Sequence, residues 1–161
     1  MEKTGVDLDL LSILQSAGKL TPTNVELLEG FRDKWNKTSY DSIIDTKLMR
    51  EEDLEFFFSS YFETLIYVES DDQFEKNPEL LVPCELAKRF GVFPLGKSDD
   101  GKKKILIFDP TNPETMNYIN ENIKNPQIYI STKSKLLSLI NQHYSLFCQV
   151  PQLKDLMDRP E

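Results

Sequence analysis

Apolar residues in the first half of the chain recur every three or four positions, a pattern typical of helices that bury one face. A short helix ends at Gly18, and a longer one begins at Pro22 with Thr21 as its cap. A short third helix starts near Ser39 and a longer fourth near Arg50. This pattern predicts four helices. The core faces are assigned to Val25, Leu28, Phe31 and Trp35 in the second helix and to Leu54, Phe57, Phe58, Tyr61, Phe62 and Leu65 in the fourth.

The four helices resemble two copies of one unit, offset by 29 residues. In each copy a short helix and a turn precede a longer helix. Apolar residues coincide when the copies are aligned: Leu14 with Ile43, Leu20 with Met49, Val25 with Leu54, and Leu28 with Phe57.

The second half alternates helices with short apolar runs. A helix over 83–90 stops at Gly91, and strands follow near 92–96 and 104–108. The gap between these two strands is so short that they can form only a hairpin. A turn, a helix from about 113, a strand at 127–131 and a helix over 133–143 complete the pattern.

Together these elements predict an α+β protein. Its N-terminal helical subdomain, 1–68, holds about four helices in two repeated helix–turn–helix units. An acidic linker is expected at 69–82. A small α/β subdomain with about three strands and three helices occupies 83–144, and a tail runs over 145–161.

Residues 91–98 match the phosphate-binding pattern G-x-x-x-x-G-K-[ST], and the apolar run at 105–108 ends at an acidic residue, Asp109. A phosphate loop follows a strand and opens a helix, so that backbone N–H groups and the helix N-terminus surround the phosphates. Here a helix precedes the motif, and a turn and a strand follow it. We therefore expect Lys97 to be a solvated loop lysine and the protein to lack ATPase activity.

The chain of 161 residues has a net charge of −8, which argues against a nucleic-acid partner. It contains neither a signal-peptide pattern at its start nor 18 consecutive apolar residues, so a cytoplasmic protein without membrane insertion is expected. Residues 51–79 hold ten acidic residues and one basic residue, Lys76. This acidity fits a solvated face with an acidic linker, or a surface that docks a basic partner.

Catalytic and metal-binding patterns are absent from the sequence. His143 is the only histidine, and Cys84 and Cys148 have no metal-ligand spacing. No catalytic residue, metal site or cofactor is therefore assigned.

Three segments resemble one known family. They are Leu81–Leu95, with its P-x-E-L-A-x-x-F-G-V-x-P-L pattern, the run from Ile105 to Asn112 with its D-P-T-N end, and the closing His143–Tyr144. These segments are similar to the N-terminal domain of type II secretion and type IV pilus assembly ATPases, over about 81–144. The resemblance implies that the Gly-x-x-Pro-Leu step joins a helix to a strand and binds no phosphate.

The first half resembles the other part of that domain, a paired 24-residue motif that binds cyclic di-GMP in some members. The motif repeats after a five-residue spacer, which equals the 29-residue offset. Its apolar and glycine positions are met by Leu10, Leu14, Gly18, Leu20 and Val25 in the first copy and by Ile43, Ile44, Met49 and Leu54 in the second.

The positions that define the ligand depart from the motif. Its arginine is replaced by Asp9 and Thr38, its first glycine by Leu11 and Tyr40, its second glycine by Lys47 in the second copy, and its closing glutamine by Arg32 and Tyr61. Bulky side chains at the glycine positions would block the dinucleotide, and Asp9 would repel phosphate. Cyclic di-GMP is therefore not expected as a partner. The altered dinucleotide site that remains as a hypothesis comprises Leu10, Leu14, Gly18, Ile43 and Lys47.

The resemblance implies a non-catalytic interaction or regulatory module. In those ATPases the domain links the motor to a membrane-anchored subunit, so we expect docking on a protein partner of a secretion, pilus or motility machine. A sensor of cyclic di-GMP or a related dinucleotide is one alternative. A protein that binds a nucleoside triphosphate through Gly91–Ser98 is the other.

Overall fold

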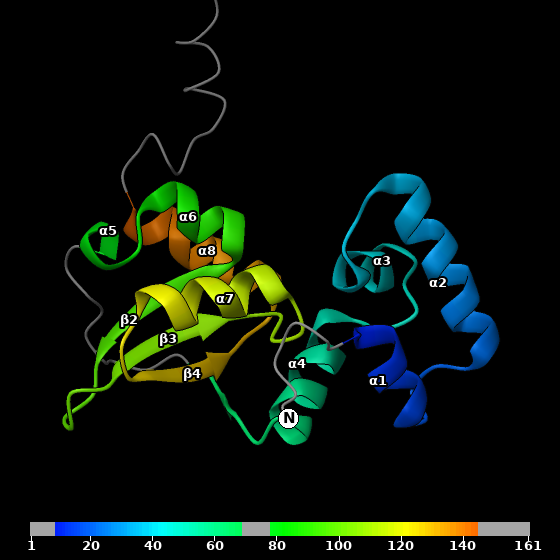
Figure 1. The fold of residues 1–161 in the computed structure, drawn as a ribbon, viewed down its shortest axis with the longest axis horizontal. Helices are drawn as coiled ribbons and strands as arrows, with labels where there is room; N and C mark the ends of the chain where they lie inside the picture. The colour runs from blue at the N-terminus through cyan, green and yellow to red at the C-terminus, as the bar shows by residue number, and fades with distance from the viewer. Residues whose placement is uncertain (1–8, 69–77, 145–161) are drawn as a thin grey trace, which may run out of the picture.

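The computed structural model of the chain describes residues 9–68 and 78–144. The first half is helical, as predicted, and its helices gather at one side of the sheet (Figure 1). They are α1 (Leu10–Ser16), α2 (Pro22–Trp35), α3 (Ser39–Asp45) and α4 (Glu51–Tyr61).

The two-copy pattern of the sequence is also a repeat of backbone geometry. The helices α3 and α4 begin 29 positions after α1 and α2, and α3 also ends 29 positions after α1. Two residues after each short helix ends the backbone is left-handed, at Gly18 with φ +79° and at Lys47 with φ +63°. The next N–H then donates to a carbonyl in the last turn, from Lys19 to Leu14 and from Leu48 to Ile43. The second glycine of the motif is thus a position of special backbone conformation.

In the described residues the strands form one four-stranded sheet in the order β1-β4-β3-β2. Figure 1 shows β2, β3 and β4 side by side. The strands β2 and β3 pair as an antiparallel hairpin, and the pairs β3–β4 and β4–β1 are parallel. Three of these strands match the predicted ones, and the fourth, β1, comes from the end of the helical half. Their bounds are Leu65–Ile66 for β1, Val92–Lys97 for β2, Lys103–Ile107 for β3 and Pro126–Ile130 for β4.

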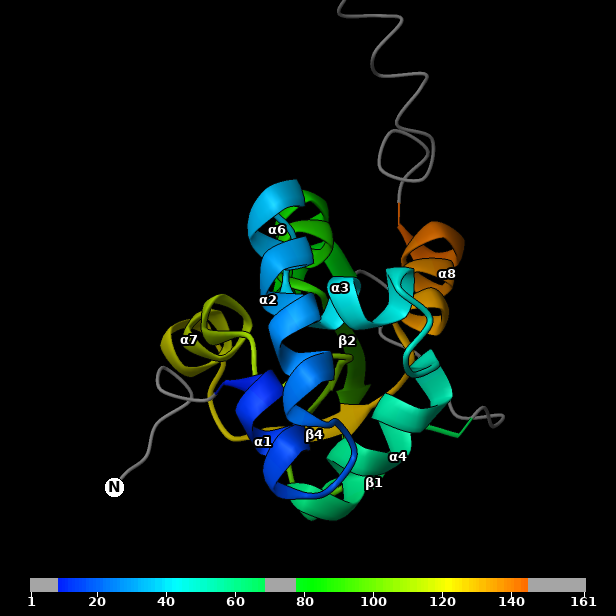
Figure 2. The same cartoon turned by 90° about the vertical axis from the view of Figure 1, so that its right-hand side faces the viewer.

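Four helices accompany the strands of the second half. The helices α6 and α8 pack against β2, and α4 packs against β1 and β4, so the sheet has helices from both halves around it (Figure 2). The helix α7 makes the crossover between the parallel strands β3 and β4. The bounds are Pro78–Leu81 for α5, Cys84–Phe90 for α6, Pro113–Asn122 for α7 and Lys133–His143 for α8.

The segment that matches the phosphate-loop pattern is a buried strand. After α6 the chain turns at Gly91, whose φ is +67°, and enters β2, where residues 92–95 are all buried. At Ser98 a tight turn begins, with the Ser98 N–H donating to the Lys102 carbonyl over 2.8 Å, and β3 follows. The predicted order of helix, strand, turn and strand is confirmed.

Two of the predicted core faces bury only part of their residues. Leu28, Leu54, Phe57 and Phe58 are buried, but the Trp35 side chain is 56% exposed. Trp35 is the last residue of α2 and lies beyond the core, beside Phe31 and under the Lys34 ammonium. The Tyr61 side chain, at the end of α4, is 50% exposed.

The division of the chain at 68, 82 and 144 stays a prediction, and residues 69–77 and 145–161 lie outside the described residues. No helix within 9–68 and 78–144 has the length and apolar character needed to cross a membrane.

Candidate functional site

A cleft of about 420 Å³ opens where the helical repeats meet the turn between β3 and α7. We call it the inter-subdomain cleft. The repeats contribute the starts of α1 and α3 and the last turn of α2, and the sheet subdomain contributes the turn at 109–114. The lining residues are Asp9, Leu10, Arg32, Thr38, Ser39, Asp109, Thr111, Asn112, Pro113 and Glu114.

Three helix caps place polar side chains at this cleft. Asp9 is the residue before α1, and its carboxylate accepts a hydrogen bond from the Ser12 hydroxyl over 2.8 Å. Thr38 caps α3 through its hydroxyl oxygen, which accepts from the Asp41 N–H. Asn112 caps α7 in the same way, by accepting from the Glu114 N–H over 2.9 Å. The caps fix these groups at the ends of helices, where they can meet a ligand.

Among the described residues that line the cleft, Arg32 is the one that is basic. Its Nη1 donates to the Ser39 hydroxyl over 3.1 Å, which ties α2 of the first copy to α3 of the second. Its Nε lies 3.3 Å from the Asp33 carboxylate. The guanidinium is thus held between the two copies and keeps further N–H groups with which to bind an anion.

Asp109 is a buried carboxyl group at the floor of the cleft, with 5% of the residue exposed. Its Oδ1 accepts hydrogen bonds from the Thr111 N–H and the Thr111 hydroxyl. Burial raises the pKa of Asp109 to about 6, although the bonds from Thr111 favour the ionised form. The charge of Asp41 raises this pKa further, and that of Lys133 lowers it. Asp109 therefore changes its charge within a mildly acidic range.

Side chains close to Asp109 join the two halves of the protein. Tyr40 is buried, and burial raises its pKa above the ordinary range. Its hydroxyl accepts from the Lys133 N–H over 3.3 Å, and its ring lies 4.9 Å from that of Phe108. The Lys133 ammonium forms an ion pair with Asp41 at 2.8 Å. These contacts hold α3 against the start of α8.

The five residues of the predicted dinucleotide site do not come together at the cleft. Leu10 lines it, whereas Leu14 and Ile43 are buried in the core. Gly18 and Lys47 occupy the left-handed turns after α1 and α3.

Arg32, Asp109 and Thr111 are not among the five residues predicted for the site, although the sequence places Arg32 at the closing ligand position of the motif. The D-P-T-N pattern drew attention to the turn, but only as a mark of the family. Its neighbours in space, α1 and α3, lie far away in the sequence.

The residues at the first glycine position do not obstruct the cleft. Leu11 and Tyr40 are fully buried in the core, and neither lines the cleft. Both side chains point into the core, so neither takes up space in this cleft.

No group of three or more histidine, cysteine or acidic residues could hold a metal ion in the part of the chain that the structure describes. The arrangement is suited to a ligand that presents both hydrogen-bond donors and negative charge, because carboxylates and hydroxyls surround one arginine.

Comparisons with known proteins agree with this architecture. Residues 65–147 match the MshEN domain family. The fold resembles a structure of MshE with cyclic di-GMP (cdg), at a TM-score of 0.65 and 17% sequence identity, covering 85% of this chain and 99% of that one.

Two crystal forms of the N-terminal domain of XpsE are also similar. One has a TM-score of 0.66 at 15% identity, covering 90% of this chain and 99% of the other. The second has a TM-score of 0.58 at 17% identity, covering 89% of this chain and all of the other. No similar sequence was found among curated proteins.

These findings correct one expectation and confirm another. The expectation that cyclic di-GMP is not a partner is contradicted, since the matching family and the similar MshE structure with cyclic di-GMP both point to this ligand. The resemblance to the N-terminal domain of secretion and pilus ATPases is confirmed. The chain belongs to the MshEN domain family.

Proposed function

We propose that the chain is a non-catalytic regulatory module of the secretion and pilus ATPase type, and that its inter-subdomain cleft binds cyclic di-GMP. One observation carries the proposal. The cleft collects the first position of the motif from both copies, Asp9 and Thr38, and the closing position of the first copy, Arg32. The positions that the motif reserves for its ligand thus line one cavity, although their residue types have changed.

The chemistry of the cleft supports a guanine nucleotide. The Arg32 guanidinium can pair with a phosphate, or with O6 and N7 of guanine. Carboxylates such as Asp9 and Asp109 can accept hydrogen bonds from the N–H groups on the other edge of the base. The volume of about 420 Å³ lies within the usual range of small-molecule sites.

Both arginines of the motif are replaced, by Asp9 and Thr38, and Arg32 at the closing position supplies one guanidinium instead, which lowers the expected affinity. A charge-assisted hydrogen bond contributes about 1.5–3 kcal/mol, so its loss weakens binding by about tenfold or more. We therefore expect micromolar rather than nanomolar binding.

Titration calorimetry with cyclic di-GMP tests the proposal. The wild-type chain should give a saturable heat, and Arg32→Ala should weaken binding about tenfold or more. Lys34→Ala removes an exposed positive charge from the same helix and should bind as the wild type does. The proposal fails if the wild type gives no heat at hundreds of micromolar, or if both variants behave alike.

A second function, docking on a protein partner of a secretion, pilus or motility machine, has separate support. The Phe56, Tyr61 and Leu65 side chains are 68%, 50% and 55% exposed, and all three belong to α4 or to the strand β1 that follows it. Large apolar side chains that stay exposed within one segment favour an interaction surface. In this proposal the module is cytoplasmic and acts without catalysis.

Affinity capture with the whole chain, followed by identification of the bound proteins, tests the docking role. A stoichiometric component of a secretion or pilus apparatus is the expected result. Repeated capture without such a component would remove the docking role and leave the ligand site unaffected.

A further inference from the structure

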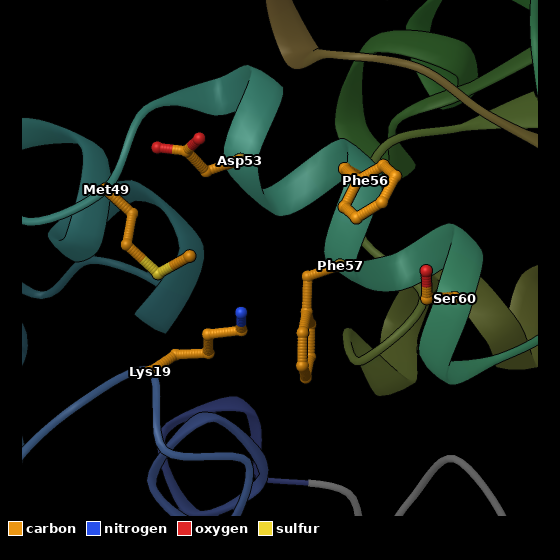
Figure 3. A pocket seen from close by; sticks show the side chains of 6 residues that line it. All are labelled: Lys19, Met49, Asp53, Phe56, Phe57 and Ser60. Atoms are coloured by element: carbon orange, nitrogen blue, oxygen red, sulfur yellow. The ribbon is translucent and has the colours of Figure 1, made fainter.

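A second cavity, of about 540 Å³, lies along one face of α4, and we call it the α4 groove. Four of its lining residues, Asp53, Phe56, Phe57 and Ser60, come from α4 at the spacing of one helix face. The opposite wall consists of Lys19, from the connection between α1 and α2, and Met49, from the connection between α3 and α4. Figure 3 shows the Lys19, Met49 and Phe57 side chains directed into the space between these elements.

The groove offers apolar surface to a partner. Phe57 is almost buried and its ring stacks on that of Tyr61 at 5.4 Å, which gives the groove a firm aromatic side. Phe56 stands mostly in solvent, and Met49 is partly exposed. Aromatic and methionine side chains favour binding of varied apolar partners, because they bury much surface and methionine adapts its shape.

The charge around the groove is negative. Helix α4 contains Glu51, Glu52, Asp53 and Glu55 and no lysine or arginine, and Glu63 follows it. Among these, Glu51 is already bonded to Ser134. Basic residues on this side include Lys19, which lines the far wall, Lys47, which is exposed in the same connection as Met49, and Arg50, whose Nε lies 4.0 Å from the Asp53 carboxylate. Because the acidic side chains around the groove outnumber these basic ones, their charge favours a basic partner.

The first copy of the repeat lacks this acidity. Positions 51–53 of α4, with two glutamates and an aspartate, correspond to Pro22, Thr23 and Asn24 at the start of α2. Because α2 forms with these residues at its start, the acidic residues of α4 are not required for the helix of the repeat to form. Phe56 corresponds to Leu27, which is also exposed, so the two copies supply an internal comparison.

We propose that the α4 groove docks a basic amphipathic helix of a protein partner, with an apolar side chain inserted beside Phe56, Phe57 and Met49. Lysine or arginine residues of that helix would lie along Glu52, Asp53 and Glu63. Helix α4 is 11 residues long, or roughly 16 Å, so about three turns of the partner helix can lie along it. The inference rests on the docking role and names its surface and partner chemistry.

Fluorescence anisotropy with a designed probe tests the groove. The probe is a labelled 14-residue helical peptide with leucine at one face and lysine elsewhere, and the control peptide carries glutamate in place of lysine. The whole chain should bind the lysine peptide saturably and the glutamate peptide at least about tenfold more weakly. Phe56→Ala and Glu52→Lys should each weaken binding of the lysine peptide about tenfold.

Two matched variants complete the test. Leu27→Ala removes the equivalent exposed apolar side chain of the first copy, and Glu29→Lys reverses an exposed acid on α2. Both should bind the lysine peptide as the wild type does. The proposal is overturned if Leu27→Ala equals Phe56→Ala, if the glutamate peptide binds equally well, or if no peptide binds.

Sedimentation of the unliganded chain tests whether a second copy of the chain occupies the α4 groove instead of a partner helix. Self-association that Phe56→Ala abolishes would assign the groove to a second copy of the chain and overturn a partner helix. Failure of the groove is distinguishable from failure of the docking role. A captured secretion or pilus protein that Phe56→Ala retains at the wild-type level would place docking on another surface.

Discussion

The Glu51 carboxylate accepts two hydrogen bonds from Ser134, one from its N–H and one from its hydroxyl, both 2.8 Å long. They join the first turn of α4 to the first turn of α8. The N-terminus of a helix leaves N–H groups without partners inside the helix, so a carboxylate there both satisfies a donor and meets the positive end of the helix. With the Lys133–Asp41 ion pair, this contact sets how the helical repeats lie against the sheet, and hence the shape of the inter-subdomain cleft.

Glu51→Ala should therefore lower the free energy of unfolding by about 1–2 kcal/mol, the usual cost of losing a helix cap. Glu52→Ala removes the neighbouring exposed acid, which is not bonded to Ser134, and should change stability by less than about 0.5 kcal/mol. Urea unfolding of both variants measures the difference. Equal stabilities would show that the Glu51–Ser134 contact adds nothing to folding.

Gly18 and Lys47 occupy equivalent left-handed positions of the repeat, so removing the side chain at one and adding a side chain at the other should change stability in opposite directions. Lys47 holds a conformation that costs a residue with a side chain about 1 kcal/mol, so Lys47→Gly should stabilise the protein slightly or leave it unchanged. At Gly18 an added Cβ would touch nothing, so Gly18→Ala should destabilise by about 1 kcal/mol through backbone strain alone. The melting temperature should fall for Gly18→Ala and stay the same or rise slightly for Lys47→Gly. A large fall in the melting temperature of Lys47→Gly would contradict the assignment of strain to this backbone conformation.

The elements of this fold were predictable because each depends on local signals. Helix α8 is found at the predicted 133–143, and α6 ends at the predicted glycine. Capping residues and periodicity fix such boundaries within short stretches of chain. Trp35 was wrongly assigned to the core because the prediction used only local periodicity. Periodicity shows which face of a helix is apolar, but not how far along the helix other elements pack against that face.

Contacts between the halves could not be predicted. The strand β1 has only two residues, and its parallel pairing with β4 links Leu65 to Tyr129. Likewise, the inter-subdomain cleft brings Arg32 and Asp109 to the lining of one cavity. No local pattern encodes either contact, because pairing depends on the packing of the whole chain.

Gly91 should be needed for packing rather than for phosphate binding. A Cβ at this position would lie 2.5 Å from the Phe108 ring, and its φ is +67°. Gly91→Ala should therefore lower the free energy of unfolding by about 2 kcal/mol or more. Gly101 also has a positive φ but open space around it, so Gly101→Ala should cost only about 1 kcal/mol. Chemical denaturation compares the two, and equal losses would remove the packing argument.

Lys97, in the same segment, should be dispensable for nucleotide binding. It ends the strand β2 and is exposed, and no helix begins beside it. We expect ATP with magnesium to leave the melting temperature of the wild type unchanged, and Lys97→Ala to melt at the same temperature. An ATP-dependent rise in the wild type that Lys97→Ala abolishes would restore the phosphate-loop interpretation.

The buried carboxyl of Asp109 should make stability depend on pH. Its pKa is raised from 3.8 to about 6 in the folded protein, mainly by burial. Below the unfolded pKa the carboxyl is protonated in both states, and the full contribution to stability is present. As pH rises towards 6 the unfolded chain ionises first, so stability is lost over this range and becomes constant above it. A tenfold change in the ionisation constant corresponds to about 1.4 kcal/mol, which limits the loss of stability to about 3 kcal/mol.

Asp109→Asn keeps an oxygen acceptor for Thr111 and cannot ionise, so it isolates this contribution. Unfolding free energies of wild type and variant should be measured in urea at about pH 4, 5, 6 and 7. Relative to the variant, the wild type should lose stability between about pH 4 and 6 and then run parallel to it. Profiles that stay parallel throughout would mean that the Asp109 carboxyl ionises as easily in the folded protein as in water, despite its burial.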